Sequence, residues 1–195
     1  MYYECPSCGW LSPHRDFRDA GGATCAKCAG TVGTGEARTF PTERLRRLDE
    51  RIRRYHREGE HEITVILAAA FLEAMLEDVL DRILTAHGAD VGVRHVVMDG
   101  QRSVGLRLSR VFPHLTGTEF EEAAAELGSR DFPHRWRQLR AARNAFIHDS
   151  PFHGAQESLD RHWADESMNL LDAAYRLFVS LNNRFAAGLA KETDR

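Results

Sequence analysis

The chain has 195 residues, with 26 Lys and Arg against 29 Asp and Glu, and a formal net charge of −3 at pH 7. Its 43% hydrophobic and 28% charged residues are typical of a globular protein and not of a disordered, fibrous or membrane chain. No uncharged apolar run reaches the roughly 18 residues that a membrane-spanning helix requires. The N-terminus lacks a basic segment followed by an apolar core. We therefore expect no signal peptide and a cytoplasmic location, where disulfides are rare.

Residues 1–40 show no helical periodicity and contain all four cysteines, together with two prolines and six glycines. This composition predicts turns, short strands and a linker. The cysteines form two CxxC pairs, Cys5/Cys8 and Cys25/Cys28, separated by sixteen residues. Each tight turn offers two sulfurs to one ion, and four thiolates complete a tetrahedral site without an open position. The pattern therefore predicts a zinc ribbon that binds structural Zn²⁺.

Residues 41–195 show helical periodicity, which predicts an all-α bundle as a second domain. Pro41 is expected in the first turn of the first helix, and Gly59 at its end. Residues 88–101 are expected to form a loop, with a short strand or turn over residues 91–98 as the alternative. Thr118 with Glu121 is expected to form a capping box. The expected helices cover residues 41–58, 63–84, 103–112, 118–127, 131–148 and 156–189.

Basic residues are concentrated in two segments of this mildly acidic chain. Residues 44–57 contain seven arginines against two acids, and residues 130–143 contain five arginines against one. Such segments are compatible with a phosphate-binding surface, although solvated helix faces have a similar composition. Of the 26 basic residues 24 are arginine, for which a GC-rich genome is the simplest explanation.

Arg143 breaks the pattern of its predicted helix. Phe132, Trp136, Leu139, Phe146 and Ile147 define one apolar face at 100° per residue, and Arg143 projects near the middle of it. An arginine is costly to bury without a partner. Two explanations are open. Arg143 pairs with an acid of the preceding apolar helix, such as Glu73 or Glu77, or it lines a cleft or a subunit interface.

His148 lies in the last turn of the same helix, where the helix dipole favours a cationic histidine. Five residues advance about 500°, so Arg143 and His148 point about 140° apart on an ideal helix. Either the helix distorts near its end, or a second copy completes the site across a two-fold axis. Asn144 stands four residues before His148 and shares its face.

The segment Arg143-Asn144-Ala145-Phe146-Ile147-His148 resembles the RNxxxH form of the Rx4–6H motif of HEPN domains. These domains are helical bundles found in ribonuclease toxins, antiviral abortive-infection proteins and CRISPR-associated nucleases. The resemblance covers about residues 42–189. It implies a HEPN-like bundle that forms a homodimer with one composite RNase site, in which the 2′-hydroxyl of the RNA attacks the adjacent phosphate without a metal ion.

Carried onto this chain, the resemblance implies that Arg143 stabilises the phosphorane charge and that His148 acts as general base or acid. Asn144 would position His148 or the phosphate. The implied role is that of a toxin or phage-defence effector, with an antitoxin or regulatory protein as a further partner. The alternative is a non-catalytic HEPN and zinc-ribbon module that binds nucleic acid or protein and dimerises.

Overall fold

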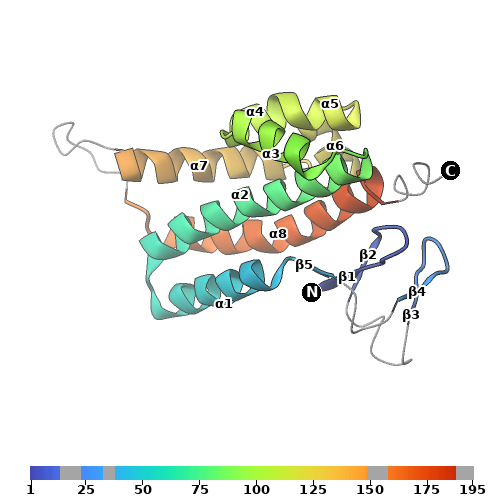
Figure 1. The fold of residues 1–195 in the computed structure, drawn as a ribbon. Helices are drawn as coiled ribbons and strands as arrows, with labels where there is room; N and C mark the ends of the chain where they lie inside the picture. The colour runs from blue at the N-terminus through green and yellow to red at the C-terminus, as the bar shows by residue number, and fades with distance from the viewer. Residues whose placement is uncertain (14–22, 33–37, 149–157, 188–195) are drawn as a thin grey trace.

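The computed structural model describes residues 1–13, 23–32, 38–148 and 158–187 and consists of a helical bundle with a small β-rich head (Figure 1). The predicted all-α fold with an N-terminal ribbon is therefore confirmed. The helical segments are α1 (Glu43–Glu58), α2 (His61–Ala86), α3 (Val91–Gly100), α4 (Val104–Leu106), the π-helix η2 (Arg107–Val111), α5 (Phe112–Thr116), α6 (Phe120–Glu126), α7 (Phe132–His148) and α8 (Arg161–Phe185). None of the described helices is long and apolar enough to span a membrane.

The head contains two small antiparallel sheets. In the first, β1 (Tyr2–Glu4) lies between β2 (Leu11–Pro13) and β5 (Thr39–Phe40). In the second, β3 (Ala23–Thr24) pairs with β4 (Thr31–Val32). The hairpins β1–β2 and β3–β4 each enclose one CxxC pair, so the strand pairing places all four cysteines at the hairpin ends.

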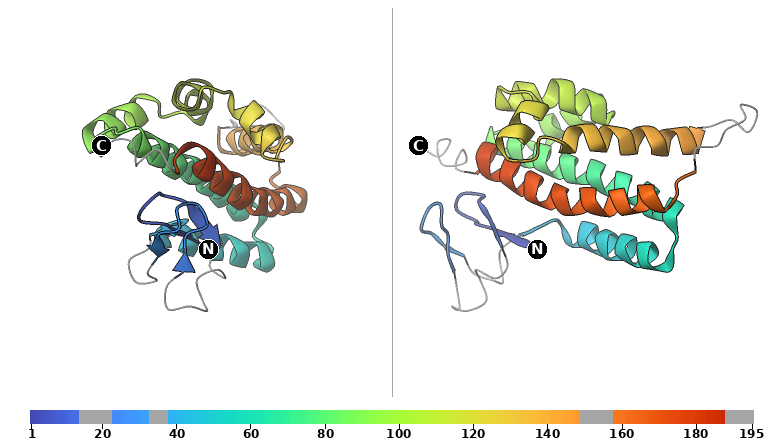
Figure 2. Two further views of the ribbon diagram at one scale, coloured as in Figure 1. Left: turned by 90° about the vertical axis from the view of Figure 1, so that its right-hand side faces the viewer. Right: turned by 180° about the vertical axis from the view of Figure 1, so that it is seen from behind.

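Helix α2 is the central element of the bundle. Twelve of its residues are buried, and it contacts α1, α7 and α8 along their lengths. Figure 1 shows α1 and α7 on opposite sides of α2, while α8 is seen in front of α2 when the molecule is viewed from behind (Figure 2). The predicted apolar helix 63–84 is confirmed. Its apolar residues cover most of its circumference because three helices pack against it.

An aromatic cluster connects α7 and α8 to the short helices. The Trp136 ring lies 6.2 Å from the Phe178 ring and 6.3 Å from the Phe120 ring, centroid to centroid, both edge to face. Phe112 in turn meets Phe120 at 5.3 Å. Edge-to-face pairs at these distances add to the free energy gained by burying the rings. This packing fixes the N-terminal end of α7 and leaves its C-terminal end to contacts with α2.

The loop predicted for residues 88–101 is wrong, because residues 91–100 form helix α3. Its four valines favour a strand by propensity, but the Asp90 side chain accepts a hydrogen bond from Val93 N at 2.8 Å and caps a helix. The buried Arg107 donates to the carbonyl oxygens of Met98 and Gln101 at the other end. Side chains therefore form hydrogen bonds with backbone groups at both ends of α3. These bonds outweigh the weak helix propensity of valine.

Three smaller expectations also need correction. The Thr118 hydroxyl donates to the Glu122 carboxylate, and Glu119 is the N-cap of α6, so the predicted capping box does not form. Pro41 precedes the N-cap Thr42 and lies outside the first turn of α1, whereas the predicted end at Gly59 is confirmed by its left-handed conformation. The helix expected over 103–112 is longer, because α4, η2 and α5 run on to residue 116.

The last predicted helix, 156–189, is shorter at both ends than expected. Helix α8 begins after Asp160, whose side chain accepts a hydrogen bond from Trp163 N at 3.2 Å. It ends at Phe185. Residues 156–157 and 188–189 of this prediction, and residues 33–37 of the predicted linker, lie outside the described residues.

The head is attached to the bundle by specific hydrogen bonds. Asn183 of α8 pairs with the backbone of β2: its Oδ1 accepts from Leu11 N at 2.7 Å, and its Nδ2 donates to Leu11 O at 2.9 Å. Next to it, Asn182 donates to Gly9 O at 3.0 Å. Arg82 of α2 forms an ion pair with Glu4 of β1. These contacts hold the expected domains, residues 1–40 and 41–195, against each other.

We expect Asn183→Ala to lower the free energy of unfolding by about 1–3 kcal/mol, because it leaves the buried backbone N–H and C=O of Leu11 without these partners. Asn169→Ala is the matched control, since Asn169 is an exposed asparagine on the same helix, and it should change stability by less than about 0.5 kcal/mol. Urea unfolding followed by circular dichroism measures both. Equal losses in the two variants would contradict this role of Asn183.

Candidate metal centre and arginine site

The first CxxC pair forms a tight turn closed by its own backbone. Cys5 N donates to Trp10 O at 2.9 Å, and Gly9 N donates to Cys5 O at 2.8 Å. Gly9 directly after Cys8 has a φ of 71°, a left-handed conformation that glycine adopts at no steric cost. Glycine therefore suits this position of the turn.

The second pair repeats this hydrogen-bond pattern with a different residue at the left-handed position. Cys25 N donates to Gly30 O and Ala29 N donates to Cys25 O, each at 2.9 Å, and Ala29 has a φ of 57°. A Cβ on Gly30 would lie 3.1 Å from Ser7 Oγ and 3.3 Å from Cys28 Sγ, so glycine avoids a tight contact beside the sulfur cluster.

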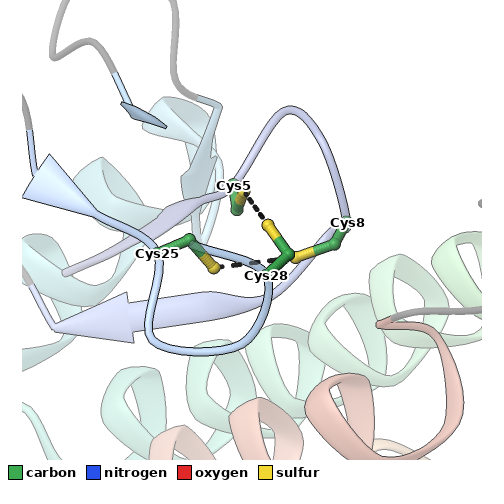
Figure 3. Close-up of side chains that lie close together, drawn as sticks. All are labelled: Cys5, Cys8, Cys25 and Cys28. Carbon is green, nitrogen blue, oxygen red and sulfur yellow. Dashed lines mark hydrogen bonds between the residues drawn. The ribbon is translucent and has the colours of Figure 1, made fainter. Parts of the chain in front are cut away.

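The four sulfurs converge on one point (Figure 3). The Sγ atoms of Cys5 and Cys28 are 3.7 Å apart, those of Cys8 and Cys25 are 3.6 Å apart, and all four lie within 4.8 Å of one another. Four sulfurs at about 2.3 Å from a tetrahedral ion would be separated by about 3.8 Å. The observed separations fit such an ion and are far too long for disulfides. The predicted cysteine cluster is confirmed as a site that can hold a metal ion.

The protein environment affects the four thiols differently. The backbone N–H of Gly30 is the main cause that lowers the pKa of Cys28 to about 7. Burial raises the pKa of the Cys5 and Cys8 thiols above their ordinary value. Metal binding requires thiolates, so an ion at this site must displace the protons of Cys5 and Cys8, and its affinity falls as the pH is lowered.

Arg143 and Arg140 share one carboxylate on α2. Arg143 Nη2 donates to Glu73 Oε1 at 2.6 Å, and Arg140 Nε lies 3.8 Å from the same oxygen. The three side chains are 21%, 23% and 30% exposed for Arg143, Arg140 and Glu73. Burial, followed by the neighbouring Arg143 charge, lowers the pKa of Arg140. Two guanidinium groups and one carboxylate leave a net positive charge in a half-buried position.

This arrangement decides between the two acids proposed as partners of Arg143. Glu73 holds Arg143, whereas Glu77 lies 3.4 Å from Arg107 Nη1. Sequence reasoning assigned no partner to Arg140. Its position three residues before Arg143 places both guanidinium groups on one side of α7, which is the signal that would have found it.

Asn144 and His148 lie on a different side of α7 and are exposed. The helix continues through His148, so within the described chain no distortion brings this histidine towards Arg143. In the described part of the structure no hydrogen bond joins Arg143, Asn144 and His148. Ile147, predicted on the apolar face, is 46% exposed. In a single chain, the side chains of Arg143 and His148 therefore point about 140° apart around the axis of α7.

Comparison with family models, curated proteins and solved structures finds no match for this chain. The HEPN resemblance therefore rests on the residues of the motif and on its place in a helical bundle. The geometry adds two features that bear on function. These are a four-sulfur cluster in the head, and a half-buried arginine pair with excess positive charge in the C-terminal half of α7.

We expect Glu73→Gln to lower the free energy of unfolding by about 1–3 kcal/mol, because it leaves two partly buried guanidinium groups without a counter-charge. Glu121→Gln is the control: Glu121 pairs with Arg137 on the surface, where both side chains are more than half exposed, so we expect a loss below about 0.5 kcal/mol. Urea unfolding measures both values. A loss for Glu73→Gln no larger than that of the control would show that the cluster contributes no stability.

Proposed function

We propose that this protein is a metal-independent endoribonuclease of HEPN type that acts as a homodimer. The observation that carries the proposal is the arginine pair Arg140 and Arg143, which shares the single carboxylate of Glu73. A net positive, half-buried cluster suits one phosphate group of RNA, because the anion supplies the missing counter-charge. His148 lies five residues further on the same helix, and histidine is the side chain that most often transfers protons in catalysis.

The reaction needs only groups of the RNA and these side chains. A histidine acting as general base takes the proton of a 2′-hydroxyl, whose oxygen attacks the adjacent phosphorus. The bond to the 5′-oxygen breaks, and this oxygen receives a proton from a general acid. The products are a 2′,3′-cyclic phosphate and a 5′-hydroxyl. Arg143 stabilises the charge of the phosphorane, and Asn144 positions His148 from the preceding turn.

The direction of the side chains supports the dimer. Arg143 and His148 of one chain cannot reach the same phosphate at about 140° apart, whereas a two-fold axis brings the histidine of the second copy towards the arginine of the first. Two exposed isoleucines support a contact at this end of the bundle. Ile147 of α7 is 46% exposed and Ile63, near the start of α2, is 40% exposed. The two helix ends lie at the same end of the bundle (Figure 1).

We also propose that the ion of the head is structural Zn²⁺. Four cysteine ligands at tetrahedral spacing are the donor set that zinc prefers, and they leave no open position for catalysis. The head has a small core of its own, formed by three buried cysteines with Tyr3, Trp10 and Cys28 packed around them. The ion would therefore supply much of the free energy that folds it.

The zinc proposal predicts one equivalent of zinc per chain in the purified protein, measured by elemental analysis. Cys25→Ser should abolish this content because three thiolates bind the ion far less tightly. Thr24→Ala, a change at the neighbouring exposed residue, should retain it. Helical circular dichroism should persist in both variants, since the bundle has a separate core. Iron in place of zinc, or full zinc content in Cys25→Ser, would refute the assignment.

The nuclease proposal predicts cleavage of single-stranded RNA in excess EDTA, with fragments that end in 2′,3′-cyclic phosphate. His148→Ala and Arg143→Ala should each lower the rate by about 100-fold or more, the contribution expected of a proton-transfer or charge-stabilising group. His134→Ala, an exposed histidine on the same helix, is the matched control and should cleave at the wild-type rate.

Two results would contradict the nuclease proposal. RNA that stays intact while it binds tightly to the wild type would favour the non-catalytic binding module. Cleavage that persists in His148→Ala would show a contaminating nuclease or another site. Because His148 is exposed, its replacement leaves the fold intact, and circular dichroism of each variant verifies this.

A further inference from the structure

Helix α1 carries many more charges than its packing requires. Only Leu45 and Ile52 are fully buried among its sixteen residues, whereas seven of the sixteen are arginine. Four acids, Glu43, Asp49, Glu50 and Glu58, lie on the same helix. The distribution of ion pairs among these groups shows which arginines are neutralised and which are not.

The acids of α1 pair with only some of its arginines. Arg46 contacts Glu43 and Glu50, and Arg53 contacts Asp49 together with Asp172 of α8. Arg47 contacts Glu43, and Arg54 lies 3.9 Å from Glu58. Within the described chain, neither Arg44 nor Arg51 has an ion pair or a hydrogen bond from its side chain.

Arg44 and Arg51 form one edge of α1. They are seven residues apart, so they differ by only about 20° around the helix and by about 10 Å along it. Both are exposed. Arg44 also lies in the first turn of the helix, where a positive charge opposes the helix dipole. A cation with neither an acidic partner nor a favourable place on its helix has no evident structural role.

The surface along this edge is hollowed. One hollow of about 600 Å³ is lined by Glu43, Arg44, Arg47, Leu48 and Arg51. A second hollow of about 250 Å³ continues along the helix and shares Arg47 and Arg51 with the first. Guanidinium groups at about one-turn spacing, with an apolar side chain between them, suit a chain of repeated phosphates better than one small anion.

A third hollow leads from this edge towards α2. It has about 530 Å³ and is lined by Arg44 and Leu48 of α1 and by Ala70 and Ala74 of α2. Four acids, Glu77, Asp78, Asp81 and Asp99, also line it, so it suits phosphate only on the side of α1. Glu73, which holds Arg143, is the chain neighbour of Ala74. Helix α2 lies between α1 and α7 in Figure 1, so the unpaired arginines and the Arg140–Arg143 pair flank the same helix.

An anionic membrane fits this surface less well than a nucleic acid. A membrane-binding helix presents large apolar side chains beside its basic ones, so that they enter the acyl region. The two fully buried apolar residues of α1, Leu45 and Ile52, face the bundle, and Leu48 is half-buried. The exposed surface of α1 is thus charged without an apolar face to insert.

We propose that the edge formed by Arg44, Arg47 and Arg51 binds the sugar–phosphate backbone of single-stranded RNA. The proposal rests on the proposed function in that RNA is the substrate. The proposal goes beyond that function because it assigns a second contact surface, outside the reacting groups. This surface supplies affinity for RNA without base specificity.

The test compares Arg44→Gln/Arg51→Gln with Arg102→Gln/Arg176→Gln. All four arginines are exposed and, in the described residues, have no ion pair, so both double variants change the net charge equally. Binding of a fluorescent, 2′-O-methylated single-stranded RNA is measured by anisotropy from about 50 to 200 mM salt. The 2′-methyl group blocks cleavage, so that binding is read independently of the chemistry.

We expect the Arg44/Arg51 variant to bind about 10-fold more weakly than wild type at 100 mM salt. Its slope of log K against log salt should fall by about 1.4, since each lost phosphate contact on a single strand accounts for about 0.7. The control should bind within about 2-fold of wild type. Equal losses of affinity in both double variants would show an effect of net charge alone and would overturn the proposal. An unchanged slope of log K against log salt in the Arg44/Arg51 variant, or a wild-type protein that does not bind the RNA, would also overturn it.

The outcome also separates this proposal from the nuclease assignment. Wild-type protein that binds the blocked RNA through Arg44 and Arg51 but does not cleave unblocked RNA would overturn the nuclease and leave the binding surface standing. If cleavage is lost in His148→Ala while Arg44→Gln/Arg51→Gln leaves RNA binding unchanged, the binding surface is overturned and the nuclease assignment stands.

Discussion

The packing of α2 is the constraint on which the rest of the structure depends. Its apolar residues contact α8 on one side, and α1 and α7 flank it. Because this burial fixes the rotation of α2, Glu73 is directed towards α7 and Arg82 towards the head. The arginine pair and the docking of the head are thus both set by the register of one helix.

Much of this organisation could be predicted from local patterns. The CxxC spacing defines the sulfur cluster because each turn closes within six residues. The long helices follow from periodicity because they bury wide apolar faces. Helix α3 was not predicted because its valines favour a strand. Two side chains stabilise the helix instead: Asp90 caps its N-terminus, and Arg107 donates to a carbonyl oxygen near its C-terminus. Only the fold reveals the second of these.

The arginine site also combines a feature that the sequence predicts with features that only the fold reveals. The off-pattern position of Arg143 pointed to a partner on α2, and two acids one turn apart satisfied that requirement equally well in the sequence. The rotation and axial position of α2 against α7 place Glu73 beside Arg143, whereas Glu77 forms an ion pair with Arg107. The three-residue spacing from Arg143 places Arg140 on the same side of α7, but only the structure shows that the two arginines share the Glu73 carboxylate.

The two cysteine turns have a consequence for how the chain can vary. Each turn is closed by hydrogen bonds between its own first cysteine and the residues four and five places later, with no bond to the other turn's backbone. The position of each sulfur pair is therefore set within its own six residues, 5–10 or 25–30. Sequence outside these two segments can change while each turn keeps its two sulfurs in place.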